Sequence, residues 1–357
     1  MKGLVKLLVI LLVLAVAFPA GPALAAKKYE RKTMNVYLGI TPHAREQVMQ
    51  YIAPKLKAKW GINLAAEAIG SGAMLEKILV QKKNPRISVA GWDVVIGVKA
   101  AKLGLCETID IEKAPNLKKL YDWALNRVDG KLQVLATSVS GVGLIYNEEL
   151  FKKKNMAPAT SWYDLWRKDL SGRISITAPE STWGTAALVT IARLEGGGEH
   201  NIDPGFKKLR TLLPYIHTIH TWSSELTKLL QLGEVWLGTT GSNMGVALRE
   251  KGFPARWVAP REGAPMMGGG MSLIKNAPLQ EVAYDFLNLY FSTEFQKIRI
   301  GTGNATSNKE AWESAEESVK ASFPVRPDRP EKLIKLDWTI INEKRAAWTE
   351  RWHKEMK

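Results

Sequence analysis

Three short segments of this chain place hydroxyl groups and glycines where a predicted strand passes into a predicted helix. They are Gly70-Ser71-Gly72, residues 181–185 (Ser-Thr-Trp-Gly-Thr) and residues 239–242 (Thr-Thr-Gly-Ser). The first N–H groups of a helix lack partners within the helix and carry partial positive charge, so a helix start can hold an anionic group. Each hydroxyl could instead simply cap its own helix. Because open α/β sheets bind ligands at the carboxyl ends of their strands, the repetition favours one shared cleft.

No recognisable set of catalytic or metal-binding residues accompanies these segments. The segment Gly-Ser-Gly-Ala-Met-Leu at 70–75 is not followed by the Gly-Lys-Ser/Thr of a phosphate-binding loop, and no Gly-x-Ser-x-Gly occurs. His217 and His220 are three apart in a predicted strand and therefore face opposite sides, without acidic or cysteine companions at zinc-site spacing. The sequence thus predicts no enzyme, no metal and no cofactor, although a secreted enzyme using the cleft stays as an alternative.

The first 25 residues have the features of a cleaved export signal. Lys2 and Lys6 precede an unbroken apolar run over residues 7–18, and Ala23-Leu24-Ala25 is the small-x-small pattern of a cleavage site. The run is shorter than the roughly 20 residues that span a bilayer. The sequence therefore predicts a periplasmic protein. The single cysteine, Cys106, cannot form an internal disulfide and is expected to be a small buried hydrophobe.

The charge of the chain is strongly basic but scattered. The formal net charge is +15, and removal of Lys2 and Lys6 with the signal leaves +13. No arginine-rich block interleaved with aromatics is present, so we expect no nucleic-acid partner. The basic excess is a weak indication of an anionic ligand or surface.

Strand and helix patterns alternate along the rest of the chain. Apolar runs at 34–40, 62–70 and 92–98 predict strands, and the segments at 45–61 and 71–84 have helical periodicity. Ser71 is a plausible N-cap of the second of these helices. Residues 132–150 contain two strand-like runs joined by 138–141 without an intervening helix, and a second α/β rhythm follows. The alternation predicts an α/β protein with doubly wound sheets.

Several long segments together resemble a known family. They are "SGVGLIYNEELFKKKNMAPATSWYDLWRKDLSGRISIT" from 140, "LLQLGEVWLG" from 229, "RWVAPREGAPMMGGGMSLIKNAPLQEVAYDFLNLYFSTEFQ" from 256 and "DWTIINEKRAAWTERW" from 337. In order and spacing they resemble the type 2 periplasmic solute-binding proteins of ABC importers, in the spermidine/putrescine-binding branch. The resemblance covers nearly all of the chain that follows the signal.

The resemblance implies two α/β domains, each a mixed sheet flanked by helices, that close on a ligand about a hinge of crossing strands. The crossings are expected near 138–141 and 267–272. The first domain is predicted to comprise residues 27–139 and 271–321, and the second residues 140–270 and 322–357. The implied partners are a small-molecule ligand and an inner-membrane permease, and the protein is expected to be a monomer. A chemosensory role is an open alternative to transport.

The ligand implied by the branch fits the residues less well. Polyamine binders hold ammonium groups with carboxylates, whereas the corresponding segments here read "APESTWGT", "MMGGGMS" and "TTGS", with Glu180 as their acidic residue. An ammonium group desolvated without a carboxylate costs several kcal/mol. We therefore expect an anionic or zwitterionic solute, and a polyamine is the alternative. The expected contacts are Thr41, His43, Ser71, Ser140, Ser181, Thr182, Trp183, Thr185, Thr239, Thr240 and Met267.

Overall fold

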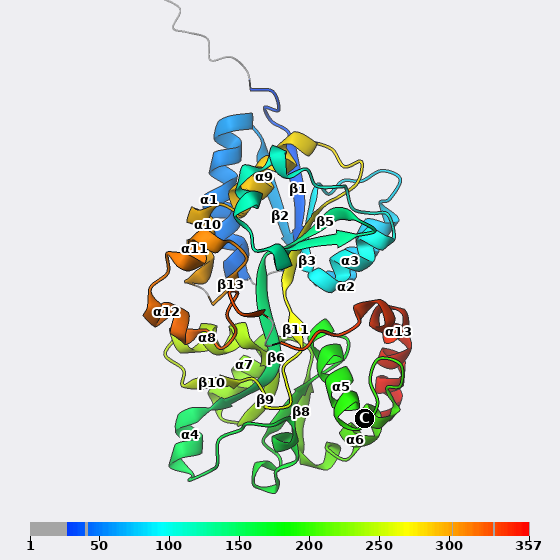
Figure 1. Ribbon diagram of the computed structural model, residues 1–357, viewed down its shortest axis with the longest axis vertical. Helices are drawn as coiled ribbons and strands as arrows, with labels where there is room; N and C mark the ends of the chain where they lie inside the picture. The colour runs from blue at the N-terminus through cyan, green and yellow to red at the C-terminus, as the bar shows by residue number, and fades with distance from the viewer. Residues whose placement is uncertain (1–26, 40–41, 302, 331–332, 357) are drawn as a thin grey trace, which may run out of the picture.

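The computed structural model describes residues 27–39, 42–301, 303–330 and 333–356, and the side chains of residues 42 and 43 are outside the description. The export signal predicted for residues 1–25 therefore lies outside the described residues. Two α/β lobes follow one another along the long axis of the molecule (Figure 1). Within the described ranges, no helix is both long enough and apolar enough to cross a membrane.

The first lobe is built on a six-stranded mixed sheet with the strand order β2-β1-β3-β12-β5-β4. β1 pairs in parallel with β2 and β3, whereas β12 is antiparallel to both β3 and β5. The carboxyl ends of the parallel strands β1, β2 and β3 therefore lie at the same edge of the sheet. The strands are β1 (Thr33–Leu38), β2 (Asn63–Ala68), β3 (Val89–Asp93), β4 (Leu125–Val128), β5 (Lys131–Ala136) and β12 (Gly269–Leu273).

The second lobe has a sheet with the order β10-β6-β9-β7-β8, in which β7, β8 and β9 are parallel. Its carboxyl edge is formed by the ends of these three strands. Two short strands, β11 and β13, pair with the start of β6. The strands are β6 (Ser138–Asn147), β7 (Ile174–Thr177), β8 (Ile216–His220), β9 (Leu237–Gly241), β10 (Ala255–Val258), β11 (Met266–Met267) and β13 (Ala305–Thr306).

Helices cover both faces of each sheet and bury the apolar residues that the strands present. Around the first sheet, one hydrophobic cluster lies on the side of α1, α9 and α10, and another on the side of α2 and α3. The second sheet is covered likewise by two clusters. The helices are α1 (Pro42–Trp60), α2 (Ser71–Val80), α3 (Val94–Lys102), α4 (Glu148–Lys153), α5 (Thr182–Leu194), α6 (Asp203–Arg210), α7 (Ser223–Leu232), α8 (Ser242–Glu250), α9 (Gln280–Tyr290), α10 (Thr293–Ile300), α11 (Lys309–Glu313), α12 (Glu317–Ser322) and α13 (Trp338–Glu355).

Two segments connect the sheets. β6 follows β5 of the first sheet directly and runs into the second, where its later residues pair with β9 and β10. The chain returns through β11, which pairs with β6, into β12 of the first sheet. The predicted two-lobed α/β fold with mixed sheets is confirmed. The residue boundaries predicted for the two domains stay a prediction.

One local prediction was wrong. Residues 92–98 were expected to be a strand, but β3 ends at Asp93 and α3 begins at Val94. At this point Val94 donates its N–H to the carbonyl of Gly268 in the returning segment, which fixes the end of the strand. The predicted alternation of strands and helices is unchanged. This correction moves Asp93 from near the start of the predicted strand to the carboxyl end of β3.

Candidate functional site

The carboxyl edges of the two parallel strand sets face one another where the lobes meet. Asp93 stands at the end of β3, in the first lobe, and its Oδ2 accepts a hydrogen bond of 2.5 Å from Thr182 Oγ1 at the start of α5, in the second lobe. The backbone N–H of Asp93 donates to Ser71 Oγ, at the start of α2, over 3.0 Å. Two of the predicted helix starts therefore converge on one carboxylate. We call this region the domain junction.

The electrostatics of Asp93 follow from its position between the lobes. Burial there raises the pKa of the Asp93 carboxyl above its usual 3.8, because the charged form loses water. The side chains of Thr182, Ser71 and Trp183 and the positive charge of Arg345 act in the opposite direction, but they do not outweigh the loss of water. The ionised form of Asp93 at the junction is therefore stabilised by the hydrogen-bond donors and the positive charge around it.

Arg345 of α13 supplies the positive charge of the junction. Its Nε donates to Thr185 Oγ1 over 3.1 Å, and its Nη2 donates to the carbonyl of Glu180 over 2.5 Å. Burial lowers the pKa of Arg345, and the charges of Asp93 and Glu180 raise it. Arginine stays protonated under such conditions. The junction therefore combines one cation with acidic and hydroxyl groups.

The start of α5 can approach β7 closely because residue 184 is glycine. A Cβ at Gly184 would lie 2.0 Å from the carbonyl oxygen of Ala178, so a larger residue would force the helix away from the strand end. Ser181 caps the helix, accepting a hydrogen bond from Trp183 N over 3.3 Å. Ser181 therefore has the capping role, while its neighbour Thr182 reaches across to the first lobe.

The start of α8 joins the same region from β9. Ser242 Oγ lies 2.7 Å from Ser140 Oγ and accepts from the N–H of Gly141 in the crossing strand β6. The ring of Trp183 lies against Gly241: a Cβ there would be 2.5 Å from the ring and 2.5 Å from Asn243 Oδ1. The three predicted helix starts thus lie around the junction, with Trp183 between two of them.

Trp222 adds an exposed aromatic ring from the second lobe. Its side chain is 58% exposed, and its ring carbons would be 3.2 Å from a Cβ on Gly70, in the first lobe. Glu225 fixes the backbone at this position by accepting from the N–H groups of Thr221 and Trp222. A large apolar surface is thereby held at the junction, beside the start of α2.

The structure brings some of the predicted contact residues together and places others elsewhere. Ser71, Thr182 and Trp183 surround Asp93, and Ser140 bonds to Ser242 at the crossing strand. Thr240 is buried, with its hydroxyl 3.5 Å from Ser223 Oγ.

Three predicted contacts lie in the interior of the second lobe. Thr185 uses its hydroxyl within α5 and toward Arg345. Thr239 bonds to Thr177 on the neighbouring strand, and Met267 packs in a hydrophobic cluster. Their polar groups and surfaces are therefore occupied by the protein itself. Thr41 and the side chain of His43 lie outside the described residues.

Four residues of the junction were missed from the sequence. Asp93 was assigned to a strand as its second residue. Arg345 lies in a segment that was used only for the family resemblance, and Trp222 lies in a segment that carries no motif. Ser242 and the other small residues at 239–242 were noticed as a helix start, but Thr239 and Thr240 were chosen in place of Ser242. The signal that could have identified Asp93 is its place as a helix N-cap, directly before an apolar helix.

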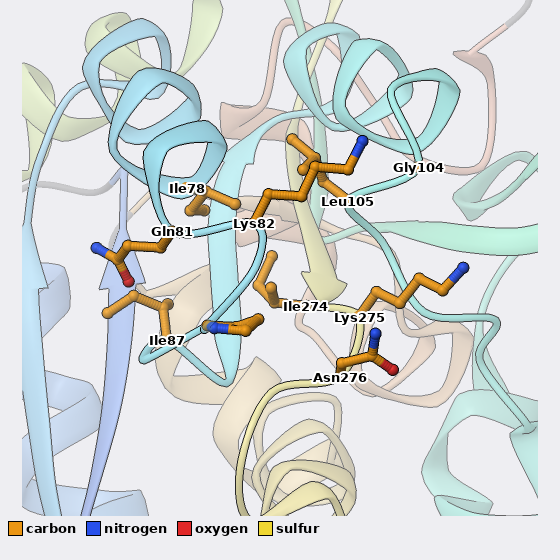
Figure 2. Close-up of a pocket in the computed structure, with 10 residues that line it drawn as sticks. Ile78, Gln81, Lys82, Ile87, Gly104, Leu105, Ile274, Lys275 and Asn276 are labelled. Atoms are coloured by element: carbon orange, nitrogen blue, oxygen red, sulfur yellow. The ribbon is translucent and has the colours of Figure 1, made fainter.

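Two hollows lie outside the junction. One, of about 150 Å³, is in the first lobe and has a mixed lining of apolar and polar side chains, with Ile78, Ile87, Leu105 and Ile274 beside Gln81, Lys82, Lys275 and Asn276 (Figure 2). The other, of about 650 Å³, lies between α13 and the ends of β7 and β8, and Glu180 lines it. The Glu180 carboxylate is 3.1 Å from His353 there. Neither hollow contains Asp93 or Thr182.

Comparison with known proteins agrees with this architecture. The family model for bacterial extracellular solute-binding proteins matches residues 50–324. A protein of Haemophilus influenzae is 26% identical over 81% of this chain and 81% of its own length. The spermidine/putrescine-binding periplasmic protein of Salmonella typhimurium is 24% identical over 72% of this chain and 74% of its own.

Solved structures share the fold at lower identity. The periplasmic binding protein AfuA of Actinobacillus pleuropneumoniae, with fructose-6-phosphate bound, has a TM-score of 0.73 at 22% identity and covers 91% of this chain and 99% of its own. The spermidine/putrescine ABC transporter substrate-binding protein of Streptococcus pneumoniae has a TM-score of 0.68 at 19% identity, covering 90% and 99%. The chain belongs to the bacterial extracellular solute-binding proteins.

Proposed function

We propose that this protein captures a small anionic or zwitterionic organic solute at the domain junction and delivers it to an inner-membrane permease. The observation that carries the charge assignment is the balance of groups on the described strand ends and loops. The acidic side chains described above are Asp93, Glu180 and Glu225, and each has a partner: Thr182 for Asp93, His353 for Glu180, and the N–H groups of Thr221 and Trp222 for Glu225. The same region offers the starts of α2, α5 and α8 and the guanidinium of Arg345.

A diamine needs a carboxylate near each of its ammonium groups, because an unpaired buried charge is costly. Helix starts and hydroxyl groups stabilise negative charge instead. Asp93 can accept one ammonium group if Thr182 releases it, and this arrangement suits a zwitterion better than a dication. We therefore favour a solute with at least one acidic group.

A polyamine is the second candidate. It is favoured by the Asp93 carboxylate at the junction and by relatives named as spermidine/putrescine-binding proteins at 24% and 25% identity. The family and its structural neighbours are transport proteins, and we propose no catalytic role. We also propose that the mature protein is a periplasmic monomer that begins at Ala26, which N-terminal sequencing of the exported protein would test.

Thermal unfolding in the presence of candidate solutes tests the charge assignment. A ligand that binds the folded protein at 100 times its Kd adds about 2.7 kcal/mol of stability, which is a measurable rise in Tm. The panel contains small carboxylic acids, amino acids and other zwitterions, sugar phosphates, phosphonates, putrescine and spermidine. We expect the rise among the acids or zwitterions. A rise with putrescine or spermidine and with no acid or zwitterion would overturn the assignment.

Mass spectrometry of the protein purified under native conditions provides an independent identification. A copurifying molecule of the proposed class should be released on unfolding. Its titration into refolded protein by calorimetry then gives the stoichiometry, which is one per chain if the single junction is the site.

A further inference from the structure

The C-terminal helix α13 is anchored in the second lobe and also contacts the first. Its residues Ile341, Trp348 and Trp352 are buried in a hydrophobic cluster of the second lobe. Trp338, at its start, packs against that cluster and against the α2–α3 side of the first lobe. Figure 1 shows α13 beside the lower lobe, reaching the level at which the lobes meet. The first turns of α13 therefore contact both lobes, and these contacts depend on the distance between the lobes.

Two polar contacts join these first turns to α3. Asn342 Nδ2 donates to the carbonyl of Val95 over 3.2 Å, and Lys102 Nζ donates to Thr339 Oγ1 over 3.2 Å. Val95 lies in the first turn of α3, the helix that begins directly after Asp93. Both contacts cross between the lobes, so they break if α3 moves away from α13.

Arg345 acts one turn further along the same helix. Its hydrogen bonds go to the side chain of Thr185 and to the backbone carbonyls of Pro179 and Glu180, which immediately precede α5. These contacts fix the loop that presents Thr182, and the positive charge of Arg345 favours the ionised form of Asp93. Arg345 thus acts on both partners of the hydrogen bond between the lobes.

We propose that α13 holds the lobes together and positions the solute site, with Arg345 acting through Thr182 and Asp93, and Asn342 acting through α3. In this arrangement Arg345 is a positioning residue: it holds the loop and the carboxylate. Closure of the junction then depends on a helix from the far end of the chain. The proposal makes no assumption about the charge of the solute. The role of α13 can therefore be disproved while the proposed solute class holds, and the solute class can be disproved while the role of α13 holds.

Fluorescence energy transfer in the solute-free protein tests the proposal. The two dye positions are Val80→Cys, at the end of α2, and Leu232→Cys, at the end of α7, whose native side chains are 88% and 60% exposed. The native Cys106 is buried and does not compete for the label. The refolded, dialysed protein is measured as wild type, Arg345→Met, Thr182→Val and the double variant, with Lys354→Met at the exposed end of α13 as the control.

We expect Arg345→Met to lower the ratio of closed to open molecules about tenfold, as for loss of a charged hydrogen bond. Thr182→Val should lower the ratio by a similar factor. The double variant should change the ratio no further, because both residues act through one contact. Lys354→Met should leave the ratio unchanged. Additive effects in the double variant would overturn the positioning role, and so would a solute-free wild type in which the closed state is never populated.

Asn342→Ala supplies a second variant should Arg345→Met fail to fold. It removes the contact to Val95 and leaves the loop before α5 in place. We expect a two- to fivefold fall in the closed-to-open ratio, about the effect of one neutral hydrogen bond. An unchanged ratio in Asn342→Ala, in protein with a wild-type circular dichroism spectrum, would overturn the coupling of α13 to α3.

Discussion

Thr182 donates a hydrogen bond of 2.5 Å to Asp93 from the opposite lobe, and this contact joins the first turn of α5 to the end of β3. Asp93 is the last residue of the parallel strand β3, and Thr182 begins the helix that follows the parallel strand β7. Ligand-binding residues of open α/β sheets collect at such ends. In the structure described here the protein satisfies these groups itself, so a solute that binds at this point has to replace the contact or add to it.

The carboxylate of Asp93 gives the first prediction, which concerns pH. Its pKa is raised in the folded protein, so the folded state holds this proton to higher pH than the unfolded chain. The stability that this group contributes is present below its usual pKa of 3.8 and is lost as the pH rises through the raised value. We expect Asp93→Asn to gain stability relative to wild type as the pH rises above about 4. Urea unfolding of both proteins between pH 3.5 and 7 measures the difference, and a constant difference would contradict the prediction.

His220 gives a second pH prediction, of opposite sign. Its ring is buried between Ser175 and Thr177, 2.7 Å and 3.0 Å from their hydroxyls, and burial lowers the pKa of His220 from 6.5 to about 4. Stability is therefore lost as the pH falls from 6.5 toward 4, by about 3 kcal/mol at about 1.4 kcal/mol per pKa unit. His220→Gln should remove this component of the pH dependence. The exposed His217, on the same strand, provides His217→Gln as the control, which should keep the wild-type slope.

Gly241 tests the packing of Trp183. In Gly241→Ala the new Cβ meets the indole ring and the Asn243 side chain at 2.5 Å, so Trp183 must move. We expect a loss of about 1–3 kcal/mol in the free energy of unfolding, the usual cost of overpacking. Gly72→Ala is the matched control, because nothing lies within 4 Å of its Cβ and alanine favours a helix. A Gly241→Ala protein as stable as Gly72→Ala would show that Trp183 does not pack there.

Trp222 tests the aromatic surface at the junction. Because its side chain is 58% exposed, Trp222→Ala should change the free energy of unfolding by less than about 1 kcal/mol. The loss of its contact with Gly70 should lower the closed-to-open ratio about two- to fivefold in the same labelled protein. Tyr163→Ala, at an aromatic side chain 40% exposed in the second lobe, is the control and should leave the ratio unchanged.

The sequence alone was sufficient for the architecture and for where the hydroxyl-lined helices begin. The alternation of apolar residues with period 2 in a strand and 3.6 in the following helix can be recognised within a short segment. The same is true of the small hydroxyl residues at 71, 182 and 242, where helices begin close to strand ends. The pattern that predicts an export signal is equally local. These features depend on neighbours within one or two turns, which is why they can be read without knowledge of the fold.

Only the tertiary structure decided which groups the helix starts face. The run at 92–98 is apolar enough for a strand, and it becomes a helix after Asp93 because the returning chain at Gly268 caps β3. Arg345 bonds to Thr185 and its charge acts on Asp93 because α13 packs its apolar face in the second lobe. Conversely, the hydroxyl of Thr185 donates to the carbonyl of Pro179, and the hydroxyl of Thr239 accepts from the N–H of Thr177 on the neighbouring strand. Both groups are therefore bonded within the second lobe. Hydrogen bonds and charge balance between distant segments depend on the three-dimensional path of the chain, which local sequence patterns do not encode.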